Sequence, residues 1–253
     1  MGVSKGEHQE VLLFPTDSSL KGKLRRVHAY LFKGFPFSAR NFDYGWYWDR
    51  LSEGNVPPTS SFKLKLIGEI VDEGSSVLDI GCGDGTLLHY LQRAKGIEAH
   101  GIEVSEKAIE LAGGKGIKVA RADISQREFQ LTETYDFIIA SEVIEHLPNP
   151  EELMSKLRGK FRKYLIITIP NTGFVGDRLR LLLGRFPKQW VVHPSEHLRF
   201  WTVTDFVFWC EQLGFKVESY YGMLDEYYDL KIKLWKYYPK LFSRYILYKV
   251  AER

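Results

Sequence analysis

The sequence has only two cysteines, Cys82 and Cys210, and they lie far apart along its 253 residues. This scarcity argues against a disulfide framework and against a zinc site built on paired cysteines, so a reducing, cytoplasmic environment is the simpler expectation. No apolar run approaches the roughly 18 residues that a membrane span needs, and the first residues lack the apolar stretch of a secretory signal. We therefore expect a soluble protein.

A strong excess of one charge is also missing. Lys and Arg number 35 against 32 Asp and Glu, and the resulting net charge of +3 is too small by itself to indicate a nucleic-acid or membrane partner. The hydrophobic fraction of 44% and the charged fraction of 26% are those of an ordinary globular protein. Without repeats or low-complexity tracts, this length suits one α/β domain with additions.

After residue 60, short apolar runs alternate with amphipathic stretches, which indicates βαβ units. The expected fold class is α/β: a Rossmann-like, doubly wound, mostly parallel sheet with a terminal antiparallel strand and helices on both faces. The interval 122–135 has only a moderate helical pattern, so no secondary structure is assigned to it from the sequence. Strands are predicted at 75–80, 98–104, 117–122, 135–140, 164–169, 215–221 and 245–250, and helices at 60–71, 85–94, 105–114, 150–162 and 204–213.

Two parts of the chain depart from this alternation. Residues 1–60 are aromatic and irregular, and we expect an N-terminal extension or lid there, ahead of a main domain at 61–253. An insert at about 171–200 is too polar and too rich in glycine and proline for a plain crossover connection. For the basic, aromatic stretch 231–253, a solvated helix face is favoured over a membrane-surface or RNA-facing patch.

The segment 77–85, VLDIGCGDG, is a buried strand that runs directly into three glycines and then into a helical pattern. Glycines let the backbone turn tightly and let a ligand approach closely. A dinucleotide would place its pyrophosphate at this helix start, where Asp79 and Asp84 bring two carboxylates instead. The G-x-G-x-G spacing also differs from the dinucleotide fingerprint. The carboxylates favour S-adenosylmethionine, because they stabilise its sulfonium and ammonium cations. The glycine spacing favours it by departing from the dinucleotide pattern.

Two further acids end the next two predicted strands. Glu103 is placed to accept hydrogen bonds from ribose hydroxyls, as an acid at this position does in dinucleotide folds. Asp123 could accept a hydrogen bond from an adenine amino group, although taken alone it is better explained as a solvated strand-end residue. The order of these acids behind the glycine turn favours a nucleoside ligand.

Four segments in this order, VLDIGCGDGTLL, GIEVS, RADI and YDFIIASEVIEHLPNP, resemble the motif series of class I S-adenosylmethionine-dependent methyltransferases. Two families are most similar, the MetW-like methyltransferases and the ubiquinone-biosynthesis O-methyltransferases. The first likeness is carried by GCGDGTLL, IPNTGFVGDRLRLLLGRFP and EHLRFWTVTDFVFWCEQLGF. The resemblance implies contacts with the methionine end from the turn, with ribose after the second strand and with adenine after the third. The cofactor residues expected are Asp79, Gly81, Cys82, Gly83, Glu103, Val104, Asp123, Ile124 and Ser141.

An acidic and histidine cluster follows the fourth predicted strand. In a helical turn, Glu142, Glu145 and His146 share one face, and His197 could join them from downstream. Similarity to the ubiquinone-pathway enzymes and to small-RNA 3′-end ribose methyltransferases implies that these four residues bind Mg²⁺ or Mn²⁺, which would orient and acidify an acceptor hydroxyl. Two alternatives stay open. His146 or His197 could act without metal as a general base, or the histidines could be structural.

The function expected from these features is S-adenosylmethionine-dependent methylation of a hydroxyl on a small molecule, with Glu145, His146 and His197 as catalytic candidates. An RNA ribose methyltransferase is the first alternative, disfavoured by the weak net charge and the lack of a recognisable RNA-binding module. The second is a MetW-like protein that acts as the partner of an acyltransferase. The E-x-x-E-H segment departs from that family's usual pattern and favours an enzyme.

Overall fold

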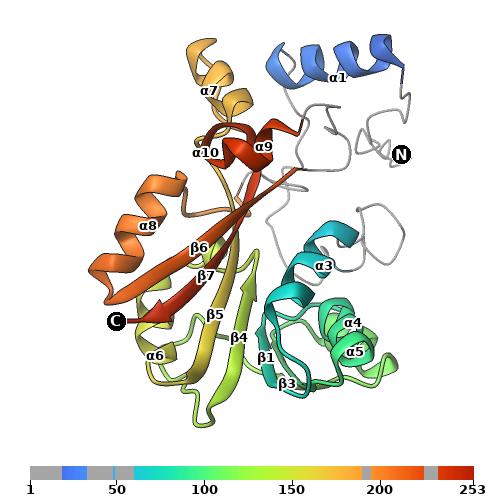
Figure 1. Ribbon diagram of the computed structural model, residues 1–253, viewed down its shortest axis with the longest axis vertical. Coiled ribbons are helices and arrows are strands. Elements are labelled where there is room, and N and C mark those ends of the chain that lie inside the picture. Colours follow the sequence, from blue (N-terminus) through green and yellow to red (C-terminus); the bar gives the residue numbers. More distant parts are fainter. Residues whose placement is uncertain (1–18, 33–47, 49–59, 190–194, 225–232) are drawn as a thin grey trace, which may run out of the picture.

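The computed structural model describes residues 19–32, 48, 60–189, 195–224 and 233–253. They form a seven-stranded sheet in the order β3-β2-β1-β4-β5-β7-β6 (Figure 1). The pairs between β3 and β5 are all parallel, whereas β7 is antiparallel to both of its neighbours. The expected fold class is confirmed. The strands are β1 (Ser76–Ile80), β2 (Glu98–Glu103), β3 (Lys118–Arg121), β4 (Tyr135–Ser141), β5 (Phe161–Pro170), β6 (Phe215–Met223) and β7 (Tyr245–Glu252).

Helices cover both faces of the sheet (Figure 1). Successive side chains of a strand point to opposite faces, so Val77 packs in one apolar cluster and Leu78 in the other. The strands are nearly continuous apolar runs because both of their faces are buried. One cluster includes α3 (Ser61–Ile70), α4 (Thr86–Lys95) and α5 (Glu106–Gly114), and the other includes α6 (Pro150–Leu157) and α8 (Val203–Gln212).

Element boundaries differ from the predictions where a turn was not recognised. The helix predicted at 150–162 ends at Leu157, because Gly159 adopts a left-handed φ of 72° and turns the chain into β5, which begins at Phe161. Ser60 precedes α3 as expected, but its side chain makes no capping hydrogen bond. The open interval between β3 and β4 consists of turns and bends.

Four helices lie beyond the carboxyl ends of the parallel strands (Figure 1). They are α1 (Leu20–Phe32), α7 (Val175–Leu182), α9 (Leu234–Tyr237) and α10 (Pro239–Phe242). We call the described residues 19–32, 171–189 and 233–244 the apical lobe. The helix α1 corrects the expectation that residues 1–60 are irregular, although most of the predicted lid lies outside the described residues. None of the described helices is both long and apolar enough to cross a membrane.

Polar groups hold the apical lobe together. The Tyr30 hydroxyl donates a hydrogen bond to the Asp177 carboxylate, and the Arg180 guanidinium donates one to the Tyr30 carbonyl. Gln189 donates a further bond to Asp177 at 3.3 Å. Because Asp177 and Arg180 are both buried, these contacts fix α1 against α7 and the end of the insert.

Candidate active site

The glycine turn after β1 depends on backbone conformations that other residues rarely adopt. Gly81, Gly83 and Gly85 have φ values of 68°, 54° and 71°, all in the left-handed region. A Cβ atom on Gly81 would lie 2.7 Å from the side chain of Val143, and one on Gly83 would lie 2.6 Å from the indole of Trp48. Conformation and close packing therefore both require glycine in this turn.

Asp79 supplies an unpartnered carboxylate oxygen beside the turn. Its side chain is buried, and Oδ1 has no hydrogen-bond partner among the described residues. Burial raises the pKa of Asp79 to about 8, and the charge of Glu103 adds to this, while the ammonium of Lys63 opposes it. A buried acid without a partner is costly, and a cationic ligand would stabilise its charged form. The residues of the turn therefore fit S-adenosylmethionine, which is cationic at this end.

Lys63 is a residue that the sequence reasoning missed. It lies in the first turn of α3, and its charge lowers the pKa of both Asp79 and Glu145. No motif marks it, since its proximity to these acids depends on how α3 packs. Lys63 therefore brings a positive charge close to two buried acids of the site.

Glu103 ends β2 and closes the glycine turn. Its Oε2 accepts a hydrogen bond from the Gly83 amide at 3.0 Å, and its Oε1 accepts from the amides of Val104 and Ser105 at 2.8 and 2.9 Å. A carboxylate has about four acceptor positions, so capacity remains for the hydroxyls of a ribose. Glu103 lies at the end of the strand, as the sequence predicts, but its hydrogen bond with Gly83 of the glycine turn was not predicted.

Asp84 does not present a free charge to a ligand. Its carboxylate pairs with the Lys115 ammonium at 2.5 Å and accepts bonds from the amide and hydroxyl of Thr86 at 3.1 and 2.8 Å. Burial alone would raise the pKa of Asp84, but these hydrogen bonds outweigh it and lower the pKa. Of the two acids, Asp79 alone therefore favours a cationic, phosphate-free cofactor, and the prediction that Asp84 also faces the ligand with a free charge is wrong.

The remaining cofactor candidates lie at the same edge of the sheet. Asp123 and Ile124 follow β3, and Ile124 packs against the core while Asp123 accepts hydrogen bonds from Ser125 and Gln126. Val104 is partly exposed after β2. The thiol of Cys82 is buried next to Gly101 of β2, since a Cβ atom on Gly101 would lie 2.6 Å from its sulfur, and the thiol also donates to the Gly83 carbonyl at 3.8 Å.

Glu142 follows β4 in a strained conformation. Its φ of 57° is the one left-handed value among the described non-glycine residues, and such values concentrate at functional sites. Its amide donates to the Thr168 carbonyl at 2.9 Å, and its carboxylate accepts from the Thr168 hydroxyl at 2.7 Å. Ser141 shares the same hydroxyl at 2.9 Å. These contacts turn Glu142 toward β5.

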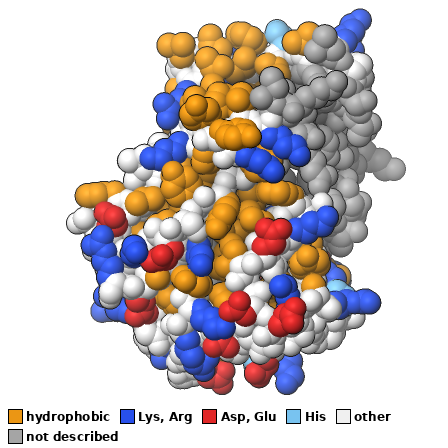
Figure 2. All heavy atoms as spheres, viewed as in Figure 1, with side chains coloured by type: hydrophobic (Ala, Val, Ile, Leu, Met, Phe, Trp, Pro, Cys, Tyr) orange, Lys and Arg blue, Asp and Glu red, His pale blue; other side chains and the backbone are white. Residues whose placement is uncertain are grey.

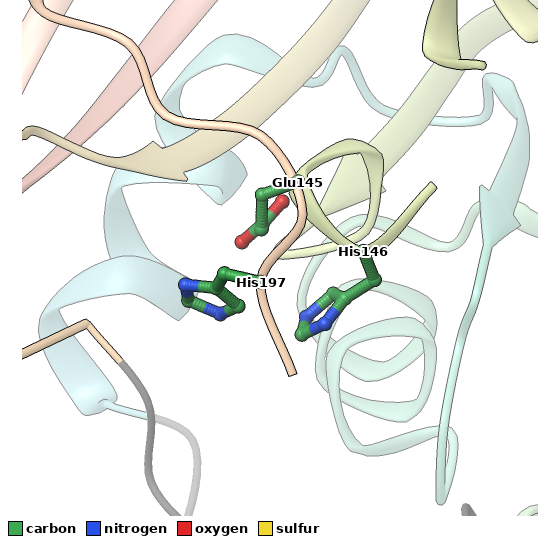
Figure 3. A group of neighbouring side chains, drawn as sticks. All are labelled: Glu145, His146 and His197. Carbon is green, nitrogen blue, oxygen red and sulfur yellow. The ribbon is translucent and has the colours of Figure 1, made fainter. Parts of the chain in front are cut away.

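Three of the four candidates for metal binding lie together. Ligand atoms of Glu145, His146 and His197 are all within 4.8 Å of one another, and this group does not include Glu142. Figure 3 shows Glu145 and His146 on the short helix η1 (Ile144–His146), with His197 on the segment that crosses it. The two imidazole rings meet edge to face, with their centroids 4.7 Å apart.

The protonation states of this group follow from burial. Glu145 is 1% exposed, and neither of its carboxylate oxygens has a described hydrogen-bond partner. Burial, with a contribution from the charge of Glu142, raises the pKa of Glu145 well above its usual range. Burial and the neighbouring His146 lower the pKa of His197 to about 3, so this imidazole is neutral at pH 7.

A hydrogen bond fixes the tautomer of His146. Its Nδ1 lies 2.6 Å from the carbonyl oxygen of Glu196. A carbonyl can only accept, so Nδ1 carries the proton and Nε2 keeps a lone pair. Burial lowers the pKa of His146 despite its hydrogen bonding to the backbone of Glu196 and of Glu142, which favours the neutral ring. His146 can therefore accept a proton or bind a metal through Nε2.

The glycine turn, the acids at the strand ends and the topology of the sheet are together those of the S-adenosylmethionine-dependent methyltransferase fold. The chain belongs to the family described as methionine biosynthesis protein MetW, whose model matches residues 61–250.

Curated relatives include several kinds of methyltransferase. The chain is 23% identical to the ubiquinone biosynthesis O-methyltransferase of Leptothrix cholodnii over 75% of this chain and 85% of that one. It is 30% identical to the bifunctional methionine biosynthesis protein MetXA/MetW of Rhodopirellula baltica over 54% of this chain and 24% of that one. It is 29% identical to a probable (S)-tetrahydroprotoberberine N-methyltransferase of Papaver bracteatum, over 60% of this chain and 48% of that one. The chain thus spans less than half the length of this plant protein.

Solved structures share the fold. The CcbJ methyltransferase of Streptomyces caelestis matches with a TM-score of 0.59 and 13% identity, over 83% of this chain and 99% of that one. Magnesium protoporphyrin IX methyltransferase of Synechocystis matches with a TM-score of 0.55 and 16% identity, over 91% of this chain and 93% of that one. At these identities the likeness concerns the fold alone.

Proposed function

We propose that this methyltransferase transfers a methyl group to the hydroxyl of a small molecule, and that Glu145, His146 and His197 receive this hydroxyl. The observation that carries the proposal is the fixed tautomer of His146, which leaves Nε2 as a proton acceptor next to a buried carboxyl group without a partner. Val143, which precedes this group, contacts Gly81 of the glycine turn. This contact supports a close approach between the acceptor and the cofactor residues.

Each group has a defined task in this proposal. Bound S-adenosylmethionine supplies an activated methyl group. Asp79 stabilises the cationic end of the cofactor, and Glu103 accepts bonds from ribose hydroxyls. His146 takes the acceptor's proton on Nε2 as the new O–CH₃ bond forms and the S–CH₃ bond breaks. Because the donor is already activated, most of the catalysis comes from this orientation and deprotonation.

The same three residues are the alternative ligand set for a divalent cation. With Glu142 turned toward Thr168, the set is two imidazoles and one carboxylate. Mg²⁺ prefers an all-oxygen environment, whereas Mn²⁺ and Zn²⁺ accept imidazole readily. Of the two metals expected from the sequence, Mn²⁺ therefore fits this donor set better than Mg²⁺.

Methyl transfer to a panel of phenols, catechols and amines tests the proposal. We expect turnover on hydroxyl acceptors and its loss in His146→Ala and Glu145→Gln, with His100→Ala on β2 as a matched control that keeps activity. Methylation of amines alone would contradict the proposal.

Treatment with EDTA followed by Mn²⁺ separates the two roles of the cluster. Activity that is lost and then restored supports metal binding, and activity that is unchanged supports His146 as the base.

A second candidate function is that of a partner of an acyltransferase. It is favoured by one observation, the Rhodopirellula baltica relative in which MetXA and MetW form a single chain. Co-purification with a homoserine acyltransferase, without methyl turnover on any acceptor, would support it. Turnover that depends on His146 would support the enzyme instead.

A further inference from the structure

The apical lobe concentrates positive charge. Its described segments contain a single acid, Asp177, which is buried and accepts a hydrogen bond from Tyr30. The whole chain carries a net charge of only +3, so the rest of the protein is acidic and the charge is strongly uneven. The cations whose side chains the structure describes in this lobe are Lys21, Arg25, Arg178, Arg180, Arg185, Lys188, Lys233, Lys236, Lys240 and Arg244.

The same lobe exposes large apolar side chains. Leu182 is 82% exposed, Phe186 59% and Tyr237 78%, on or just after helices α7 and α9. Figure 2 shows hydrophobic side chains gathered over the upper part of the molecule, with Lys and Arg side chains around them. Apolar groups gathered within a polar rim mark interaction surfaces. The other exposed apolar side chains of the lobe are Leu24, Val27, Phe32, Leu179, Leu181, Leu183 and Tyr238.

The helix α7 is inverted relative to an ordinary surface helix. Surface helices normally bury an apolar stripe and expose their charges. In α7 the buried residues are Asp177 and Arg180, which contact α1, whereas Leu179, Leu181 and Leu182 are exposed. Polar contacts therefore hold α7 in place, and the leucines of this helix face the solvent.

We propose that the apical lobe is a docking surface for an anionic phospholipid bilayer. An interfacial helix combines apolar residues that enter the acyl boundary with cations that meet anionic headgroups, and α7 with its basic neighbours provides both. Nucleic acid would match the cations but offers no partner for leucines, because it is bound through phosphates and stacked bases. The surface lies beyond the carboxyl ends of the strands, on the side of the molecule where the active-site residues follow β4.

Co-sedimentation of the full chain with vesicles tests this inference. We expect binding to vesicles of phosphatidylcholine mixed with phosphatidylglycerol, weak binding to phosphatidylcholine alone, and a decrease at high salt because the headgroup attraction is screened. Leu182→Asp should abolish binding. The pair Arg185→Glu and Lys236→Glu should lower the partition coefficient at least about tenfold, since each basic residue near an anionic surface contributes about fivefold.

Matched controls lie elsewhere on the molecule. Phe208→Asp on α8 and Lys118→Glu on β3 change an exposed apolar residue and an exposed cation, and both should bind like the unchanged chain. Unaltered melting temperatures establish that the variants fold. Three results would overturn the proposal: vesicle binding that survives Leu182→Asp, a dimer that Leu182→Asp dissociates without any vesicle binding, or binding of polyuridylate in place of vesicles. None of these readouts depends on methyl transfer, so the outcome is separate from that of the proposed acceptor chemistry.

Discussion

The backbone amide of Gly83 donates a hydrogen bond to Oε2 of Glu103, with 3.0 Å between the nitrogen and the oxygen. This bond joins the turn after β1 to the end of β2. The other oxygen of Glu103 accepts from Val104 and Ser105 at the start of the next loop. One buried carboxylate therefore fixes the shape of two loops that contain predicted cofactor residues.

Replacing Glu103 by glutamine is expected to weaken binding of S-adenosylhomocysteine at least about tenfold. Glutamine keeps the shape of the side chain but has one acceptor oxygen fewer. A buried backbone amide is then left without a hydrogen-bond acceptor, at a cost of about 1–3 kcal/mol. Titration calorimetry measures the affinity, and urea denaturation measures the free energy of unfolding. The variant Glu98→Gln changes an exposed acid at the start of the same strand, and both quantities should stay unchanged there. Equal affinity in the two variants would contradict the role of Glu103.

Gly83 and Gly96 make a matched pair for the glycine turn. Both have a left-handed φ, 54° and 60°, but a Cβ on Gly96 meets nothing within 4 Å, whereas one on Gly83 meets Trp48 at 2.6 Å. Gly96→Ala should cost only the conformational penalty of about 1–2 kcal/mol. Gly83→Ala should cost more and should also weaken cofactor binding. Adding Trp48→Ala should recover part of the extra loss of stability, and no recovery would contradict this packing.

We expect Lys63 to bind the carboxylate of the cofactor's methionine end. Its ammonium acts on both Asp79 and Glu145 from the first turn of α3. Lys63→Met should therefore lower the affinity for S-adenosylhomocysteine at least about fivefold, as loss of a charge-assisted hydrogen bond does, and leave the affinity for its decarboxylated analogue unchanged. Lys65→Met on the exposed side of the same helix is the control. An equal loss for both ligands would indicate a purely structural role.

Asp79 makes the stability of the cofactor-free protein depend on pH. Burial raises the pKa of Asp79 from 3.8 to about 8, so the folded chain holds a proton that the unfolded chain releases. Stability is therefore lost as the pH rises from about 4 to about 8. The variant Asp79→Asn cannot ionise at this position. Its free energy of unfolding should therefore exceed that of the unchanged chain by more at pH 8 than at pH 5. Urea denaturation at both values provides the measurement, and a difference that is constant with pH would contradict it.

The sheet and the glycine turn were predictable because both are local features of the sequence. The alternation of apolar strands and helices predicts the parallel sheet, and the spacing of glycines after Asp79 predicts the turn. The helix α1 was missed although Leu24, Val27 and Leu31 recur at helical spacing. In the structure Leu24 and Val27 are exposed, and α1 is held instead by polar contacts of Tyr30 with Asp177 and Arg180, far along the chain.

The details of the site depend on contacts that sequence spacing does not contain. Asp84 was expected to face the ligand, but Lys115 neutralises it from beyond the end of α5. Glu142 was expected to share a helical face with Glu145 and His146. Its left-handed φ instead turns it toward Thr168, since η1 begins only at Ile144. The helical spacing rule therefore failed at the residue where the backbone leaves the ordinary helical region.

The position of β7 also constrains how the protein forms during synthesis. This strand pairs with β5 on one side and β6 on the other, so β6 has no direct contact with the parallel strands through its backbone. A growing chain can pair β1 to β5 early, but β6 must wait for residues that leave the ribosome after every other strand. Such long-range closure is slow. Until it occurs, the edge of β5 and the apolar side of α8 stay open to chaperones and to aggregation.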